Sequence, residues 1–122
     1  MAGLFSSLFK RKLTPEQAYE KGMACYDAGD YANAFTYFQT AAQEGHAQAQ
    51  YRLAKLCADG LGTGMNSEEA LRWYGCAARQ GHDESREIIE HAAQHGNSGA
   101  QCDLGEIIEK GIGVKKSKIQ AV

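Results

Sequence analysis

The apolar positions of this 122-residue chain follow the period of an α-helix. Apolar residues recur every three or four positions, and no segment alternates at a period of two. Glycines stand where these segments end, and capping sequences such as Thr14-Pro15 stand where they begin. The pattern predicts an all-α protein with short connections, so neighbouring helices should pack antiparallel as hairpins. We expect helices near 15–28, 31–43, 47–58, 67–79, 83–95 and 98–110.

One stretch of the chain nearly repeats after 36 residues. The run from Ala34 to His46 reads AFTYFQTAAQEGH, and the run from Ala70 to His82 reads ALRWYGCAARQGH. Self-similarity at such a period is typical of stacked helical units. These units present a surface to a partner more often than they carry out chemistry. The repeat therefore predicts a binding module.

The repeated residues resemble a known family. Residues 41–54 (AAQEGHAQAQYRLA), the glycine turn at 60–62 and the run ALRWY at 70–74 are similar in order and spacing to the Sel1-like repeat. The first unit, residues 22–41, is similar to the related tetratricopeptide repeat. The resemblance implies an α-α solenoid of antiparallel helical hairpins. It also implies that a concave groove, lined mainly by one inner helix of each hairpin, binds a peptide or a helix of another protein.

The repeat becomes irregular after residue 81. Glu90 stands where Ala54 stands one unit earlier, at a position that the family fills with a small residue. Residues 92–96 (AAQHG) repeat residues 41–45 at an offset of 51 instead of 36. The helix expected over 83–95 therefore begins like an inner helix and ends like an outer one. Whether this unit stacks regularly is left open by the sequence.

The ends of the chain are basic and its middle is acidic. Residues 14–109 hold all 15 acidic residues and six of the 13 basic ones. We divide the chain into a leader at 1–13, a repeat domain at 14–111 and a basic stub of a further repeat at 112–122. The acidic body argues against nucleic acid and favours a protein partner with basic segments, although a merely solvated surface explains it equally well. The uncapped stub is explained by a homodimer through the C-terminal end or by truncation of a longer chain.

Candidate groove residues follow from the resemblance, because in tetratricopeptide-like stacks they flank the small residue of each inner helix. Here the small residues are Gly22, Ala54 and Gly105. The flanking set, with the irregular unit included, is Tyr19, Met23, Tyr26, Tyr51, Lys55, Glu87, His91, Cys102, Glu106 and Glu109. Tyrosine suits a binding surface because it offers a large rigid contact with a polar tip. Packing within the stack explains Tyr19 and Tyr51 equally well.

The leader supports a second hypothesis, a membrane-peripheral adaptor. Its apolar residues share one face if the segment is helical, and basic residues follow them, which suits an anionic membrane surface. The residues concerned are Leu4, Phe5, Leu8, Phe9, Lys10, Arg11 and Lys12. No apolar run is long enough for a membrane span, the leader lacks the order of a secretory signal, and the four cysteines form no disulfide or CxxC pattern. We therefore expect a cytoplasmic protein, with a membrane-peripheral location as the alternative.

An enzyme or a metal-binding protein is the third hypothesis. His91 and His95 are spaced to face one ion, but zinc takes three or four ligands. The cysteines occupy packing positions, where burial makes thiols inert. We expect His46 and His82, which follow helix-ending glycines, to be exposed turn residues without chemistry. The sequence thus predicts a non-catalytic adaptor or scaffold that uses no metal and no cofactor.

Overall fold

The computed structural model describes residues 13–111, which form six α-helices and no strand. The bounds are Pro15–Asp27 for α2, Tyr31–Gln43 for α3, Ala47–Asp59 for α4, Ser67–Arg79 for α5, Asp83–Gln94 for α6 and Ser98–Lys110 for α7. Every bound lies within one residue of the prediction, and the all-α fold is confirmed. Leader residues 1–12 and the stub at 112–122 lie outside the described residues. Within the described range, no helix has the length and apolarity needed to cross a bilayer.

Local capping contacts explain why these bounds follow from the sequence. Thr14 Oγ1 accepts the backbone N–H of Gln17 at 3.1 Å, and Gln17 Oε1 accepts the backbone N–H of Thr14 at 3.0 Å. The later helices also begin at side chains that accept a backbone N–H three residues on; these are Asp30, His46, Asn66, His82 and Asn97. Such contacts involve only neighbours in the sequence, so the pattern of residues is enough to place them.

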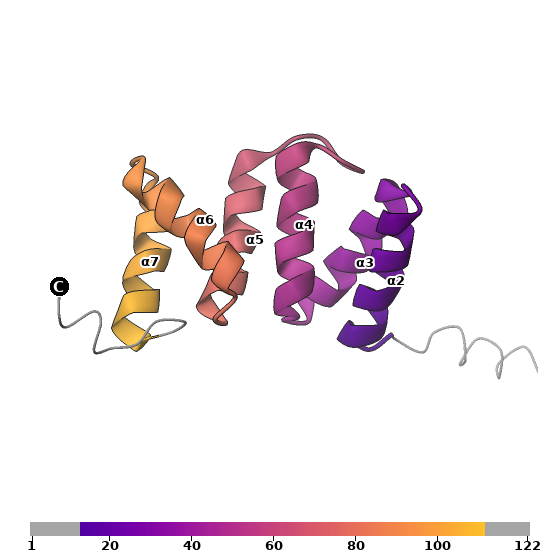
Figure 1. Cartoon of the computed structure of the whole chain (residues 1–122), viewed down its shortest axis with the longest axis horizontal. Coiled ribbons are helices and arrows are strands. Elements are labelled where there is room, and N and C mark those ends of the chain that lie inside the picture. The colour runs from indigo at the N-terminus through magenta and orange to yellow at the C-terminus, as the bar shows by residue number, and fades with distance from the viewer. Residues whose placement is uncertain (1–12, 112–122) are drawn as a thin grey trace, which may run out of the picture.

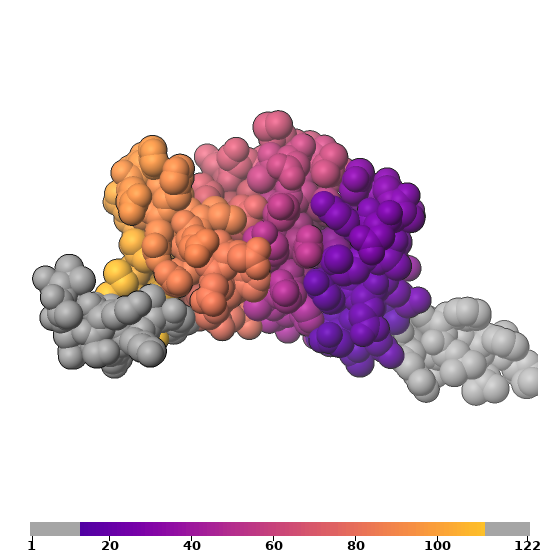
Figure 2. Space-filling model, in the orientation of Figure 1, coloured from indigo at the N-terminus to yellow at the C-terminus, as the bar shows by residue number. Residues whose placement is uncertain are grey.

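The helices form antiparallel hairpins that stack side by side (Figure 1). The hairpins are α2–α3, α4–α5 and α6–α7, and the contacts α3–α4 and α5–α6 join them. We call α2, α4 and α6 the inner helices; they run in the same direction, so their N-terminal ends lie at one edge of the molecule (Figure 1). Figure 2 looks onto the inner helices, and atoms of α4 lie there between those of α2 and those of α6. We call this surface the inner-helix face.

The core depends on large side chains of outer helices that fill the space beside small residues of inner helices. Phe38 of α3 is fully buried, and a Cβ on Gly22 of α2 would lie 2.6 Å from its ring. One repeat later, the buried Tyr74 of α5 belongs to the same core cluster as Ala54 of α4. Because the first two hairpins each place a bulky residue against a small one, their helices can approach closely.

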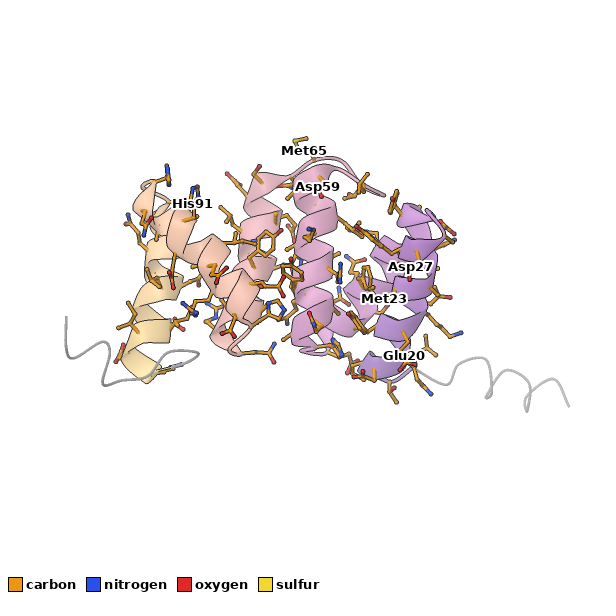
Figure 3. The ribbon with its side chains drawn as sticks, in the orientation of Figure 1. Glu20, Met23, Asp27, Asp59, Met65 and His91 are labelled. Carbon is orange, nitrogen blue, oxygen red and sulfur yellow. The ribbon has the colours of Figure 1, made fainter. Side chains whose placement is uncertain are left out.

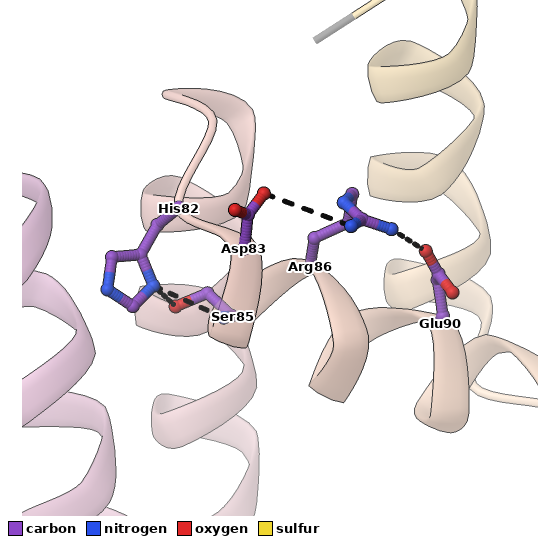
Figure 4. Close-up of polar contacts among 5 residues, drawn as sticks. All are labelled: His82, Asp83, Ser85, Arg86 and Glu90. Atoms are coloured by element: carbon purple, nitrogen blue, oxygen red, sulfur yellow. Dashed lines mark hydrogen bonds and ion pairs between the residues drawn. The ribbon is translucent and has the colours of Figure 1, made fainter. Parts of the chain in front are cut away.

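The third hairpin departs from this arrangement at its small residue. Glu90 takes the position of Ala54 and forms an ion pair with Arg86 on the same helix (Figure 4). A charged side chain at this position has to reach solvent, so an outer helix cannot close over it as α3 closes over Gly22. Gly105 of α7 is also uncovered, because a Cβ there would meet no atom within 4 Å.

α7 is anchored to α5 as well as to α6. Asp103 of α7 lies so close to Gly75 of α5 that a Cβ on Gly75 would overlap its Oδ2. Arg79 donates to Asp103 Oδ1 at 2.6 Å. Burial raises the pKa of the Asp103 carboxyl, with Arg79 opposing the shift and Glu106 adding to it. A glycine in the middle of α5 thus admits a carboxylate that ties the two helices together.

Hydrogen bonds identify α6 as a helix of mixed character. At the α3–α4 junction, Gln50 Nε2 donates to the carbonyl of Ala42 at 3.1 Å. At the α6–α7 junction, Gln101 Nε2 donates to the carbonyl of Ala93, also at 3.1 Å. The end of α6 therefore behaves as the end of an outer helix. Its start, described below, behaves as the start of an inner one, so the stacking changes within α6.

Substitution of alanine at two corresponding glycines should have opposite effects on stability. Gly22→Ala forces its methyl group against Phe38, and we expect the free energy of unfolding to fall by about 1–3 kcal/mol. Gly105→Ala meets no neighbour and replaces a glycine inside a helix, and we expect a gain of about 0.5–1 kcal/mol. Urea unfolding of the full chain measures both changes. A loss of stability at Gly105 would show that this position is covered after all.

Candidate partner-binding surface

Tyr51 of α4 is the centre of an aromatic and charged cluster on the inner-helix face. Its ring centroid lies 4.7 Å from that of His82 and 5.9 Å from that of Tyr74. Its hydroxyl donates to Glu84 Oε2 at 3.1 Å, and Lys55 Nζ lies 5.9 Å from its ring centroid. Tyr51 thus connects α4 with α5 and with the first turn of α6.

Arg52 extends the cluster to α2. Its guanidinium carbon lies 5.9 Å from the ring centroids of both Tyr26 on α2 and Tyr51 on α4, within the range of a cation–π contact. Its Nε is buried without a hydrogen-bond partner. We call Tyr26, Tyr51, Arg52, Lys55 and Glu84 the tyrosine cluster. It joins all three inner helices in one surface.

His46 is not the exposed turn residue that the sequence predicts. It is the N-cap of α4, and its side chain is only 16% exposed. Nδ1 accepts the backbone N–H of Ala49 at 3.1 Å, so the ring proton lies on Nε2, which donates to Glu16 Oε2 at 3.0 Å. The ring also stacks on Tyr19, with centroids 4.8 Å apart. His46 therefore fastens the start of α4 to α2.

His82 repeats the same contact one unit later, and the prediction of an exposed turn is wrong here too. Its Nδ1 accepts the backbone N–H of Ser85 at 3.2 Å and lies 2.9 Å from the Ser85 hydroxyl (Figure 4). Its Nε2 lies 2.9 Å from Gln48 Oε1, and its ring packs on Tyr51. We call this arrangement the histidine latch. The sequence did not reveal it because the ring acts on the preceding inner helix, more than 25 residues away in the chain.

Burial controls the ionisation of the tyrosines and of one thiol. The pKa of Tyr51 is raised by burial first, then by its hydrogen bond to Glu84. Burial raises the pKa of Tyr74 to about 12, so both tyrosines keep their phenolic protons at neutral pH. Burial likewise raises the pKa of the Cys57 thiol, which lowers its thiolate fraction and reactivity.

The other cysteines are more accessible than the packing prediction implies. Cys25 occupies the position in α2 that Cys57 occupies in α4, but it is only half-buried. The hairpin that contains α4 lies between the other two hairpins, whereas α2 belongs to the hairpin at one end of the described stack (Figure 1). Cys76 is also half-buried, and Cys102 is exposed.

The predicted groove residues fall into two groups. Met23 and the two tyrosines of α2 are half-buried, while Glu87 and His91 of α6 are exposed. The α7 set, which is Cys102, Glu106 and Glu109, lies on a helix packed mainly against α5 and α6 and not against α4. The structure therefore brings together the candidates on α2, α4 and α6 and separates those on α7 from the tyrosine cluster. Partner binding by any of them stays a prediction.

Two residues of the tyrosine cluster were missed by the sequence reasoning. Arg52 is adjacent to Tyr51 and one helical turn before Lys55. This pair of cations on one inner helix could have indicated that Arg52 belongs to the same surface as Lys55. Glu84 could not be found in this way, because its hydrogen bond to Tyr51 joins residues 33 positions apart.

His91 and His95 lie next to each other at the end of α6. Their rings stack with centroids 4.2 Å apart, and His95 Nδ1 donates to the carbonyl oxygen of His91 at 2.8 Å. Among residues 13–111, no group of three or more histidine, cysteine, aspartate or glutamate side chains is placed to hold a metal ion.

The comparisons with known proteins identify the family. The family model described as Sel1 repeat matches residues 17–46, 47–82 and 98–122, well over half of the chain. The chain therefore belongs to the Sel1 repeat family, whose members generally act in protein–protein interaction and are typically non-catalytic. The matches leave out residues 83–97, which hold the mixed helix α6. No curated protein matches the sequence significantly.

Two solved structures share the fold. A Sel1 repeat protein from Oxalobacter formigenes is 28% identical over 84% of this chain and 52% of its own, with a TM-score of 0.57. The protective antigen c5321 of uropathogenic Escherichia coli, which displays an SLR fold, is 27% identical over 83% of this chain and 27% of its own, with a TM-score of 0.55. The chain thus spans about half of the first protein and about a quarter of the second. The Sel1-type solenoid fold is confirmed.

The histidine latch should stabilise the stack beyond its role as a cap. His82→Asn keeps a good N-cap but removes the ring from Tyr51, and we expect unfolding to become easier by about 0.5–1.5 kcal/mol. His82→Ala removes the cap as well and should cost about 1 kcal/mol more. Asn97→Ala, at a cap without such a ring, is the matched control and should cost about 1 kcal/mol. Equal stability of His82→Asn and the unsubstituted chain in urea would contradict the latch.

Proposed function

We propose that the chain is a non-catalytic adaptor that binds a peptide or a helix of a partner protein on its inner-helix face. The tyrosine cluster carries this proposal, because it combines half-buried rings, two cations and a carboxylate from three helices in one surface. Tyrosine and arginine are the residue types that contribute most binding energy in interfaces. Membership of a family that acts in protein–protein interaction supports the same function.

The charges of the described residues favour a partner segment with lysine or arginine. Arg72, Arg79 and Arg86 are each engaged in an ion pair within the chain, which neutralises half of the cations between residues 14 and 109. Exposed acids remain on the inner helices; Glu20 and Asp27 lie along α2 with Met23 between them (Figure 3). A basic segment would therefore be attracted to this face.

The exposed end of α7 supports a second proposal, a homodimer through the C-terminal end. A shallow hollow of about 350 Å³ lies between α6 and α7. Its lining is mostly apolar and consists of Ala93, Gln94, Gln101, Leu104, Gly105 and Ile108. Ile108 is 40% exposed, which is unusual for a large aliphatic residue of this structure. Light scattering of the full chain and of the Ile108→Glu variant distinguishes a dimer held by this hollow from a monomer.

Charge reversal on α6 tests peptide binding. The probe is a labelled amphipathic peptide of leucine and lysine, and fluorescence anisotropy measures its affinity for the full chain. We expect Glu87→Lys to weaken binding about tenfold, and we expect affinity to fall as salt rises from low to physiological concentration. Glu109→Lys makes the same change of charge on α7 and should leave affinity unchanged. If both variants lost affinity equally, or if affinity did not depend on salt, the inner-helix face would not be the binding site.

A further inference from the structure

Leu13, the residue just before the N-cap of α2, packs against the repeat domain. Leu13, which we assigned to the leader, is half-buried and packs against the core cluster that contains Ala18 and Phe38. It is the residue before the N-cap Thr14, a position from which an apolar side chain commonly fixes the direction of the entering chain. Tyr19, on the inner-helix face, packs against the same cluster. Leu13, to which the leader is joined, therefore lies at the edge where the inner helices begin (Figure 1).

The leader has the composition that the inner-helix face is expected to bind. Leu4 and Leu8 are four residues apart, as are Phe5 and Phe9, so that one helical face would be apolar. Three cations follow at residues 10–12, and residues 1–12 contain no acid. The segment is thus a basic amphipathic peptide that belongs to the chain itself.

The face next to the entry point is complementary in charge and in polarity. Glu16 is in the first turn of α2 with its side chain 69% exposed, and Glu20 is exposed one turn later (Figure 3). The half-buried ring of Tyr19 lies between them in the sequence. Tyr51 of the tyrosine cluster follows on α4, and the exposed Glu84 of the same cluster lies on α6. Cations close to residue 13 would meet acids first, and apolar residues further from it would meet tyrosines.

The leader is long enough to reach these residues. Twelve residues span up to about 40 Å when extended, and a helix over residues 4–12 would be about 14 Å long. The ring centroids of Tyr19 on α2 and His46 at the start of α4 are 4.8 Å apart, and the guanidinium carbon of Arg52 on α4 lies 5.9 Å from the ring centroid of Tyr26 on α2. The step from α2 to α4 is therefore short compared with the length of the leader.

We propose that residues 4–12 bind to the inner-helix face of their own chain. Lys10, Arg11 and Lys12 pair with Glu16 and Glu20, and Phe5 and Phe9 lie against Tyr19 and Tyr51. The docked leader then covers the surface assigned above to a partner, so a partner segment of similar chemistry has to displace it. This regulatory consequence rests on the proposed function, whereas the docking itself does not.

Photo-crosslinking of the full chain tests the docking without any partner. A benzophenone amino acid replaces Phe5 in one protein and, as a matched control, Ile119 in another, because Ile119 also stands close to a run of lysines. Irradiation of Phe5-labelled protein should give intramolecular crosslinks to peptides that contain Tyr19 or Tyr51, and the Ile119 protein should not give them. Mixing isotope-labelled with unlabelled chains identifies crosslinks between molecules. Crosslinks only between molecules, or none to α2 and α4, would overturn the proposal.

A competition experiment tests the regulatory consequence. The triple variant Lys10→Glu, Arg11→Glu and Lys12→Glu should bind the leucine–lysine peptide at least tenfold more tightly than the unsubstituted chain, because the covering segment is repelled. The variant Lys115→Glu, Lys116→Glu and Lys118→Glu changes the net charge equally and should bind like the unsubstituted chain. An equal gain in both variants would attribute the effect to net charge and contradict the proposal.

Two further results separate the possible failures. If no variant binds the peptide while the Phe5 crosslinks form, the proposed function fails and the docking stands. In the second experiment the full chain is mixed with phosphatidylserine vesicles, and flotation measures how much of it binds. If the vesicles abolish the crosslinks in proportion to this binding, the leader prefers a membrane surface. That result would overturn the proposal that the leader occupies the inner-helix face.

Discussion

The stack depends on the close approach of each inner helix to its outer helix, and this approach requires a small residue on one side. Gly22 accepts the ring of Phe38, and Ala54 shares a cluster with Tyr74. Helices that meet in this way leave little space for rearrangement, because even one added methyl group at Gly22 would overlap the ring. At Glu90 the requirement is broken, and it is after this residue that the chain packs differently, with α7 against α5 as well as α6.

The sequence was sufficient for the helices because their ends depend on near neighbours. The bounds of all six helices and the mixed character of α6 followed from caps, glycines and the offset of residues 92–96. The contacts between hairpins did not follow. The ring of His46 on Tyr19 and the carboxylate of Asp103 against Gly75 join residues 27 and 28 positions apart, and no local pattern encodes such distances. Gly75 inside α5 indicated that something approaches this helix closely, but the sequence does not show that the approaching residue comes from α7.

The arrangement of the candidate residues followed from the sequence only in part, for the same reason. Positions relative to Ala54 selected Tyr51 and Lys55, which the structure places together on α4, with Lys55 Nζ 5.9 Å from the Tyr51 ring centroid. The α7 residues were grouped with them on the assumption of regular stacking, which Glu90 interrupts. Tyr19 and Tyr51 also proved to serve the stack itself through the histidine latch. Substitution of these rings would therefore disturb packing as well as any binding, whereas substitution of the exposed Glu87 tests binding with less effect on the stack.

Within α6 the chain changes from the contacts of an inner helix to those of an outer helix, and this change interrupts the regular alternation of the stack. After this change, α7 packs against both α5 and α6 and so does not extend the row of α2, α4 and α6. A segment bound along that row, as proposed above, would therefore contact α2, α4 and the first turns of α6, and α7 would contribute nothing to it. The reach of the proposed surface is thus set within α6 and not by the number of helices in the chain.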